Sequence, residues 1–315
     1  MPDWTVSSSE RLDTFLVSQG AFDSRNRAQR AIEEECVSVN DIIASKPSQQ
    51  LKEGDRVTVT GDIAIHASSI TPQDLHLQVL YEDDACLVIE KPEGIAVHPG
   101  AGMADGEMTL LHGIAHLFQE RGVPFSSEAV LAHRLDKETT GCILVAKSPA
   151  AHQQLQEQFA ERTIEKTYLA LVAGIPSPPL ATIDSPIGRS AQDRTKMAVI
   201  GNTAAREART TYRTLGSAGQ TALLACDLHT GRTHQIRVHL SAVGHPVLGD
   251  QTYKSPLSER VATEFKITDL CLHAWRLAFT SPADGERKQI IAPMPKIFRD
   301  ALQRAGIFWV DGPKE

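Results

Sequence analysis

Segments typical of β-strands follow one another through most of this chain, with few helical segments between them. From about residue 79, apolar or alternating runs predict strands at QVLYE, CLVIEK, TGCILVAKS, EKTYLALVAG and LCLHAWRLAF. A doubly wound parallel sheet needs a crossover helix between successive strands, and helical patterns such as TLLHGIAHLFQER and PAAHQQLQEQFAERT are too few. The sequence therefore predicts an α+β fold with a mixed, mainly antiparallel sheet.

The first sixty residues predict a smaller unit. One helical pattern ends at Gly20, a second follows Ser24, and two short alternating runs, CVSVN and DRVTVTG, predict strands. The polar, turn-forming stretch HASSITPQD then resembles a linker. We therefore expect a small α/β domain at residues 1–62, a linker at 63–78 and a larger domain at 79–315.

Charge is unevenly distributed along the chain. The formal net charge is −7, which is unusual for a nucleic-acid-binding protein because contacts to phosphate need Lys and Arg. Residues 189–237, however, hold eight basic and three acidic side chains, a local balance of +5. This concentration of basic residues indicates either a confined site for a polyanion or an ordinary solvated surface.

Other features argue against several classes of protein. No apolar run is long enough to span a bilayer, and no signal peptide is visible, so we expect a cytoplasmic protein. The five cysteines lie far apart and include no CxxC pair, which is typical of reduced thiols. His112 and His116 have the spacing of metal ligands, but no third ligand is evident, and we expect no metal.

The most distinctive segment is AHRLDKETTG, which places Asp136 between cationic neighbours just before a predicted strand. A loop at the edge of a strand can present a carboxylate to a cleft while the sheet holds it in place. An aspartate that caps a turn would give the same pattern. Asp136 alone therefore does not identify a site.

Two further segments give Asp136 a context. They are EKTY at residues 165–168 and HTGRTHQIRVHLSAVGHPVLGD at residues 229–250. In this order, the three segments closely resemble the RluA-type pseudouridine synthases, whose motifs are HRLDxxTSG, KTY and TGRxHQIRxH…GxPxxGD. The resemblance covers roughly residues 80–300 and implies the pseudouridine synthase fold. Thr140 stands where the family usually has Ser, a change that keeps the hydroxyl group.

The resemblance implies a reaction and a set of catalytic residues. Uridine becomes pseudouridine when its glycosidic bond breaks and the base re-attaches through ring carbon 5, and no cofactor is needed. Asp136 matches the family's catalytic aspartate, Tyr168 its active-site tyrosine and Arg237 the arginine that pairs with the aspartate. An arginine partner favours the ionised form of a carboxylate.

The expected partner is RNA. Arg134 is expected to fill the space left by the flipped base or to bind a flanking phosphate, although a salt bridge to Glu138 is an equal alternative. Arg232 is expected to support the RNA backbone or a loop. Residues 10–60 resemble the small RNA-binding domain that many of these synthases share with a ribosomal small-subunit protein. Its candidate RNA-binding residues are Arg25, Arg27 and Arg30, in a segment (residues 1–62) whose net charge is nevertheless −4.

Two other functions compete with isomerisation. A nucleosidase or glycosidase would also attack an anomeric carbon, but it usually employs two carboxylates, and Glu138 is the only acid near Asp136 in sequence. A non-catalytic RNA-binding protein would have no reason to keep Asp136, Tyr168 and Arg237 together. Within the synthases, the N-terminal domain and the loop VHPGAG favour large-subunit ribosomal RNA as the substrate, with transfer RNA as the alternative. We expect a monomer.

Overall fold

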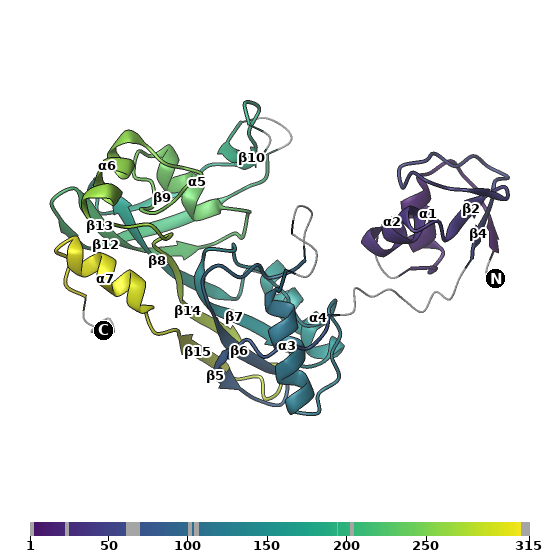
Figure 1. Cartoon of the computed structure of the whole chain (residues 1–315), viewed down its shortest axis with the longest axis horizontal. Coiled ribbons are helices and arrows are strands. Elements are labelled where there is room, and N and C mark those ends of the chain that lie inside the picture. Colours follow the sequence, from purple (N-terminus) through teal and green to yellow (C-terminus); the bar gives the residue numbers. More distant parts are fainter. Residues whose placement is uncertain are drawn as a thin grey trace. The chain divides into compact units, whose positions relative to one another are not determined.

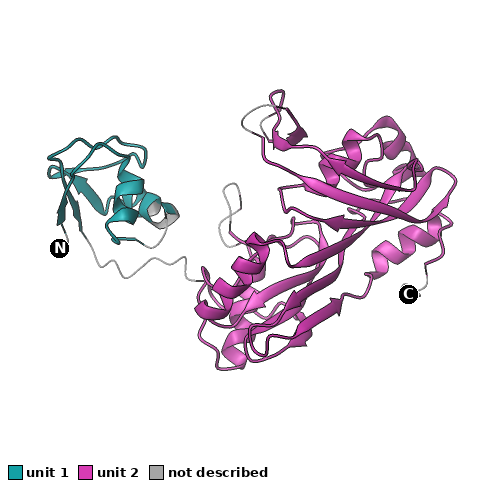
Figure 2. Cartoon of the chain, turned by 180° about the vertical axis from the view of Figure 1, so that it is seen from behind, with its two compact units in different colours: residues 1–69 teal, residues 70–315 magenta. Residues whose placement is uncertain are grey.

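The computed structural model describes residues 3–22, 25–60, 70–99, 103, 107–193, 195–201 and 205–309, without the side chains of residues 26, 27 and 30. The chain divides into two compact units, residues 1–69 and 70–315, each with its own hydrophobic core (Figure 2). Residues 70–78, expected to be part of a linker, belong to the second unit. There the Gln73 N–H donates to the His112 carbonyl (3.1 Å), and Leu77 packs against Gly113.

The first unit is a small sheet with two helices packed on it (Figure 1). The strand order is β1-β4-β2-β3, and all pairs are antiparallel. Its elements are β1 (Asp3–Thr5), α1 (Leu12–Ser18), α2 (Arg25–Glu33), β2 (Val37–Val39), β3 (Ile42–Ile43) and β4 (Arg56–Val59). Gly20 lies just beyond α1 at φ +69°, the left-handed stop that the sequence predicted. Ser24, the predicted cap of the second helix, lies outside the described residues.

Three described residues of this unit adopt a left-handed backbone without being glycine. Asn40 (φ 51°) and Asp41 (φ 64°) form the two-residue turn between β2 and β3, a turn that needs positive φ at both positions. Glu35 (φ 61°) precedes β2. Positions 35 and 41 are those where the resembled RNA-binding domain usually has glycine. Non-glycine residues therefore occupy these left-handed positions, at some cost in backbone strain.

The second unit is built on one nine-stranded sheet of order β5-β6-β7-β14-β8-β13-β12-β9, with β15 paired to β14. All neighbouring pairs are antiparallel except β14 with β7, so the sheet is mixed and mainly antiparallel, as the sequence predicted. The strands are β5 (Gln78–Glu82), β6 (Cys86–Lys91), β7 (Thr140–Ala146), β8 (Glu165–Ala173), β9 (Leu180–Asp184), β12 (Arg209–Ala218), β13 (Thr221–Leu228), β14 (Leu272–Thr280) and β15 (Arg287–Ile291).

Helices cover both faces of this sheet. On β6, Leu87 and Ile89 join the core that contains α3, whereas Cys86 and Val88 join the core that contains α4. Burial on both faces explains why the central strands are apolar at nearly every position. The helices are α3 (Leu110–Glu120), α4 (Pro149–Ala160), α5 (Gln235–Ala242), α6 (Pro256–Glu264) and α7 (Lys296–Arg304). A separate hairpin is formed by β10 (Ile187–Arg189) and β11 (Met197–Val199).

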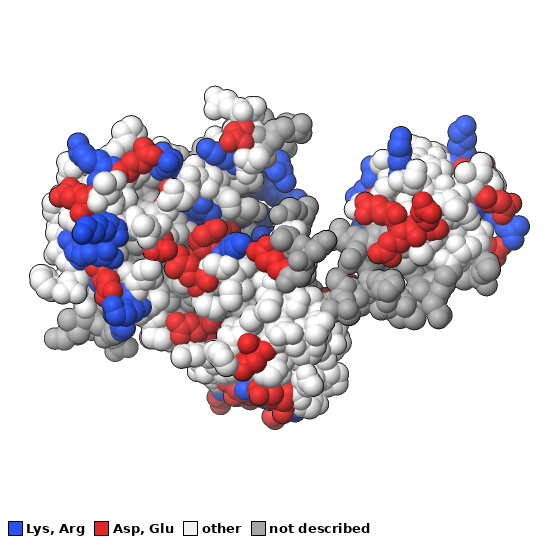
Figure 3. All heavy atoms as spheres, viewed as in Figure 1, with Lys and Arg blue, Asp and Glu red and all other residues white. Residues whose placement is uncertain are grey.

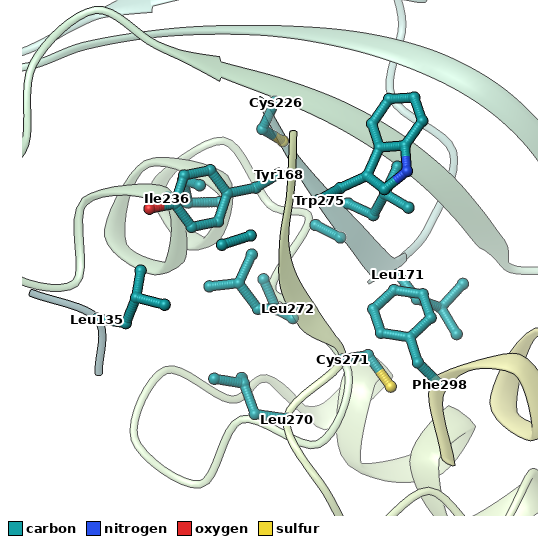
Figure 4. Close-up of a cluster of buried hydrophobic side chains, with 14 of the residues drawn as sticks. Leu135, Tyr168, Leu171, Cys226, Ile236, Leu270, Cys271, Leu272, Trp275 and Phe298 are labelled. Atoms are coloured by element: carbon teal, nitrogen blue, oxygen red, sulfur yellow. The ribbon is translucent and has the colours of Figure 1, made fainter. Parts of the chain in front are cut away.

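The larger core cluster reaches from α7 to the start of the predicted catalytic segments. Figure 4 shows Phe298 of α7 and Trp275 of β14 at one side of this cluster and Tyr168 of β8 at the other, beside Ile236 of α5. Leu135, next to Asp136 in sequence, also belongs to the cluster and is 4% exposed. The residues that flank the predicted site are therefore held by the main core of the unit.

Candidate active site

A cavity of about 430 Å³ lies where the three distinctive sequence segments meet. Its walls come from the loop before β7, from the end of α4 and the start of β8, and from the turn that leads from β13 into α5. The lining residues are 132–136, 139, 159, 160, 162, 164, 166, 168, 228–237 and 272. We call it the Asp136 pocket. It brings together Asp136, Tyr168 and Arg237, which lie far apart in the sequence.

Asp136 lies in the loop that leads into β7. The backbone N–H of Thr139 donates to the Asp136 carbonyl (3.1 Å), which closes a turn just before the strand begins. The Asp136 side chain is 18% exposed, and its Oδ2 accepts a hydrogen bond from Nη1 of Arg237 (3.3 Å). The sheet and the turn thus hold a partly buried carboxylate beside a guanidinium.

Lys91, at the end of β6, binds the backbone of the Asp136 loop through its side-chain amine. Its side chain is fully buried, and Nζ donates to the carbonyls of Pro92 (2.8 Å), Lys137 (2.8 Å) and Thr139 (3.0 Å). Burial lowers the pKa of Lys91 to about 8, although nearby acids, Glu138 first, favour its charged form. Sequence reasoning missed this residue, because nothing local shows that its amine is enclosed by a distant loop.

Replacing Lys91 with Met should lower the free energy of unfolding by about 2–4 kcal/mol, because three carbonyls near the Asp136 loop lose their donor. Urea unfolding followed by circular dichroism measures this change. The matched control is Lys296→Met, which removes a surface ion pair whose lysine side chain is 80% exposed and should cost less than about 1 kcal/mol. Equal losses in the two variants would contradict the structural role of Lys91.

Asp250 is the main partner of Arg237. Nε of Arg237 donates to Oδ2 of Asp250 (2.7 Å) and Nη2 to Oδ1 (2.9 Å), whereas the Asp136 contact is single and longer. Burial disfavours the charge on Asp250, but the hydrogen bonds from Arg237 outweigh it and keep the pKa of Asp250 below its ordinary value. Asp250 thus anchors the guanidinium and leaves Nη1 free to face Asp136.

The backbone just before Asp250 packs closely against the backbone of Asp269. Gly249 has φ +79°, and a Cβ at this position would lie 1.8 Å from the carbonyl oxygen of Asp269. Only glycine fits there. Gly249 and Asp250 end the third distinctive sequence segment, and the sequence alone predicted no role for either.

His234 also faces Asp136, and sequence reasoning missed it. Helix α5 begins at Gln235, and His234 precedes it with a left-handed backbone (φ 55°). Nδ1 of His234 shares a hydrogen bond with the Tyr253 hydroxyl (2.9 Å), whose oxygen also accepts from the Met197 N–H (3.0 Å). Nε2 of His234 lies 3.9 Å from Oδ1 of Asp136.

Tyr168 forms an apolar wall of the Asp136 pocket. The residue is 8% exposed, and its ring lies beside Ile236 (Figure 4). Burial, reinforced by the charge of Asp136, raises the pKa of Tyr168 well above its usual range. The phenol is therefore protonated at neutral pH and offers a flat face and a hydrogen-bond donor.

The arginines predicted to bind RNA occupy different environments. Arg134 is exposed at the Asp136 pocket, and Arg232 also lines it, with Nε donating to the Glu207 carbonyl (2.9 Å), a loop-supporting contact. In the first unit, Arg25 donates to the buried carboxylate of Asp13 (3.0 Å) with its side chain 53% exposed. The side chains of Arg27 and Arg30 lie outside the described part. On the face in Figure 3, basic and acidic side chains of the second unit are interspersed.

The two histidines with metal-like spacing have other partners. Nδ1 of His112 accepts from the Thr109 N–H (3.0 Å) and so caps α3, and His116 lies near Asp74 and Glu120. Within the described ranges, no group of three or more His, Cys, Asp or Glu side chains is arranged to hold a metal ion. Likewise, no helix in the described ranges is long and apolar enough to cross a membrane.

Comparison with known proteins gives the family to which this fold belongs. Residues 85–242 match the model of the RNA pseudouridylate synthase family, and residues 10–57 match the S4 domain. The chain belongs to the RNA pseudouridylate synthase family. The resemblance predicted from its motifs is therefore confirmed, and so is the pseudouridine synthase fold.

Relatives and solved structures agree with this assignment. The ribosomal large subunit pseudouridine synthase D of Nitrosomonas europaea is 40% identical over 93% of this chain and 83% of that protein. An uncharacterized RNA pseudouridine synthase of Synechocystis is 38% identical over 93% of this chain and 88% of that protein. The structure of human RNA pseudouridylate synthase domain containing 4 superposes with a TM-score of 0.59 at 29% identity, covering 72% of this chain and 92% of that one.

Proposed function

We propose that this chain converts uridines of large-subunit ribosomal RNA to pseudouridine, with the carboxylate of Asp136 as the nucleophile. The observation that carries the catalytic part is the composition of the Asp136 pocket. Among the described residues that line the pocket, Asp136 is the only acid. Nη1 of Arg237 and Nε2 of His234 each face one of its oxygens, so a guanidinium and an imidazole flank the carboxylate.

The single carboxylate also separates this proposal from hydrolysis. Glycosidases usually position two carboxyl groups on either side of the scissile bond. Glu138, the nearest acid in sequence, is exposed and does not line the pocket. Among its described lining residues, the pocket therefore supplies a nucleophile without the second carboxylate that glycosidases use.

The chemistry follows from the pocket's surroundings. The target uridine leaves its stack, at a cost of a few kcal/mol that falls in loops and single strands, and enters the pocket. Asp136 then adds to the anomeric carbon, adds to the uracil ring or assists elimination at the sugar, and each route begins with an ionised carboxylate. The ring of Tyr168 forms a wall of the pocket and stacks on the base. Its phenol stays protonated and can donate a hydrogen bond. Carbon 5 of uracil loses its proton after the new bond forms.

The choice of substrate rests on relatives and on the first unit. Two relatives, of Nitrosomonas europaea and Zymomonas mobilis, are named ribosomal large subunit pseudouridine synthase D. The S4 match supplies a candidate second RNA contact, which would involve Arg25, Arg27 and Arg30. We propose that the protein works in the cytoplasm as a monomer, since the Asp136 pocket is complete within one chain.

Mapping pseudouridine in ribosomal RNA tests the substrate. Cells that lack the gene should lose one or more pseudouridines from large-subunit RNA, and a plasmid copy of the wild type should restore them. A plasmid with Asp136→Asn should not. Unchanged large-subunit RNA together with a pseudouridine lost from a transfer RNA would overturn the choice of substrate but leave the reaction intact.

A further inference from the structure

Lys166 is a second cation in the Asp136 pocket that the mechanism above does not use. It lies two residues before Tyr168 on β8, so the two side chains point to the same face of the sheet. Its amine lies 5.4 Å from the centre of the Phe159 ring, at the end of α4. It also lies 3.8 Å from the place where a Cβ of residue 231 would be, and residue 231 is a glycine.

The amine has no counter-charge in the described part of the protein. Two other lysines with little exposure have polar partners: Lys147 contacts Glu82 (2.7 Å), and the fully buried Lys91 donates to three carbonyls. Burial lowers the pKa of Lys166 to about 8, and no neighbouring acid counteracts it. A partly buried ammonium group that faces a cavity and lacks a partner is costly unless a ligand supplies one.

The anions in and around the pocket are already engaged. The Asp136 carboxylate faces Arg237 and His234. Glu207, near the pocket, pairs with Arg162 (2.8 Å). The described acids named here do not pair with Lys166, and RNA, which carries one phosphate at every nucleotide, can supply the anion.

We propose that Lys166, with the Phe159 ring and Gly231 beside it, forms a subsite for one phosphodiester of the strand that carries the flipped uridine. This inference rests on the proposed function. Glycine at position 231 leaves open the space beside the amine, so that a phosphate oxygen can reach it. Lys166 is then a positioning residue: it fixes the backbone of the target nucleotide while Tyr168 fixes its base, and the sugar between them is placed at Asp136.

A cycle of paired changes in protein and RNA tests this contact. The Asp136→Asn protein is used so that bound RNA is not converted, and affinity is measured for RNA fragments in which one phosphodiester at a time is replaced by a neutral methylphosphonate. One linkage next to the target uridine should weaken binding by about tenfold, the size expected for a charged hydrogen bond. In Asp136→Asn/Lys166→Gln, the same linkage should cost no more than its neighbours.

The controls separate this contact from a structural role. Lys147→Gln in the Asp136→Asn background, which removes a paired lysine outside the Asp136 pocket, should keep the tenfold effect, and Lys166→Arg should keep most of it. If every linkage costs the same in both proteins, Lys166 supports the fold through Phe159 alone and the proposal is wrong. Failure of the proposed function would look different, because the wild type would then form no pseudouridine in the unmodified fragment.

Discussion

Replacing Asp136 with Asn is expected to reduce pseudouridine formation by at least about 10⁴-fold while leaving the protein folded. The amide is nearly isosteric with the carboxylate but does not ionise, so it is a very poor nucleophile. The fold should survive because Arg237 keeps its bidentate pair with Asp250, and Leu135 still anchors the loop in the core. Single-turnover conversion of a large-subunit RNA transcript measures the rate.

Glu138→Gln is the matched control for this variant. It neutralises a carboxylate two residues away that is exposed and outside the Asp136 pocket, and it should keep the rate within about threefold of the wild type. The RNA affinity of Asp136→Asn should also remain close to that of the wild type. A rate within tenfold of the wild type for Asp136→Asn would remove Asp136 from the role proposed for it.

Replacing Asp250 with Ala is expected to cost about 3–5 kcal/mol of stability, because the buried guanidinium of Arg237 loses its bidentate partner. The backbone N–H groups of Thr252 and Tyr253 lose an acceptor as well. Activity should fall strongly, since an unanchored Arg237 no longer faces Asp136 in a fixed position. Urea unfolding and the single-turnover assay measure the two effects on the same samples.

A double variant separates stability from catalysis at this pair. Arg237→Met/Asp250→Leu replaces the buried ions with apolar groups of similar volume and should recover most of the stability that Asp250→Ala loses. It should remain as inactive as the single variant, because no guanidinium faces Asp136. Recovery of activity along with stability would show that the pair serves the fold alone.

The same pair predicts how stability depends on pH. The pKa of Asp250 lies below its ordinary value of 3.8 in the folded state. Its contribution is therefore fully present above that ordinary value and is lost as the pH falls through the lowered pKa. The wild type should lose more stability on acidification than Asp250→Ala does, and unfolding at several acidic pH values would show a smaller slope for the variant.

Much of the fold could be predicted from local pattern. Strands β6, β7 and β8 are apolar at most positions because helices or neighbouring strands bury both of their faces, and such runs are visible in a sequence. The edge strand β9 and the outer strand β15 were missed. Each is only partly buried, so their side chains mix polar and apolar types without a clear alternation.

Some residues of the Asp136 pocket could be predicted from the sequence motifs, whereas others are visible only in the structure. Motif resemblance linked Asp136 to Arg237, which lies 101 positions away, and the structure brings the two within 3.3 Å. It did not show that Asp250 binds Arg237 more closely, that Lys91 holds the Asp136 loop or that Lys166 lacks a partner. Each of these depends on burial and on distances between distant segments. The left-handed backbone of His234 was also missed, because a histidine just before a helix gives no local signal of positive φ.

The most direct test of the central claim is a balance of products from RNA labelled with tritium at uracil carbon 5. The purified wild-type protein should release one tritium for each pseudouridine formed, with no free uracil, because the base leaves the sugar and returns to it within the Asp136 pocket. Free uracil that still carries its tritium would point to hydrolysis, and tritium loss without pseudouridine would also contradict isomerisation.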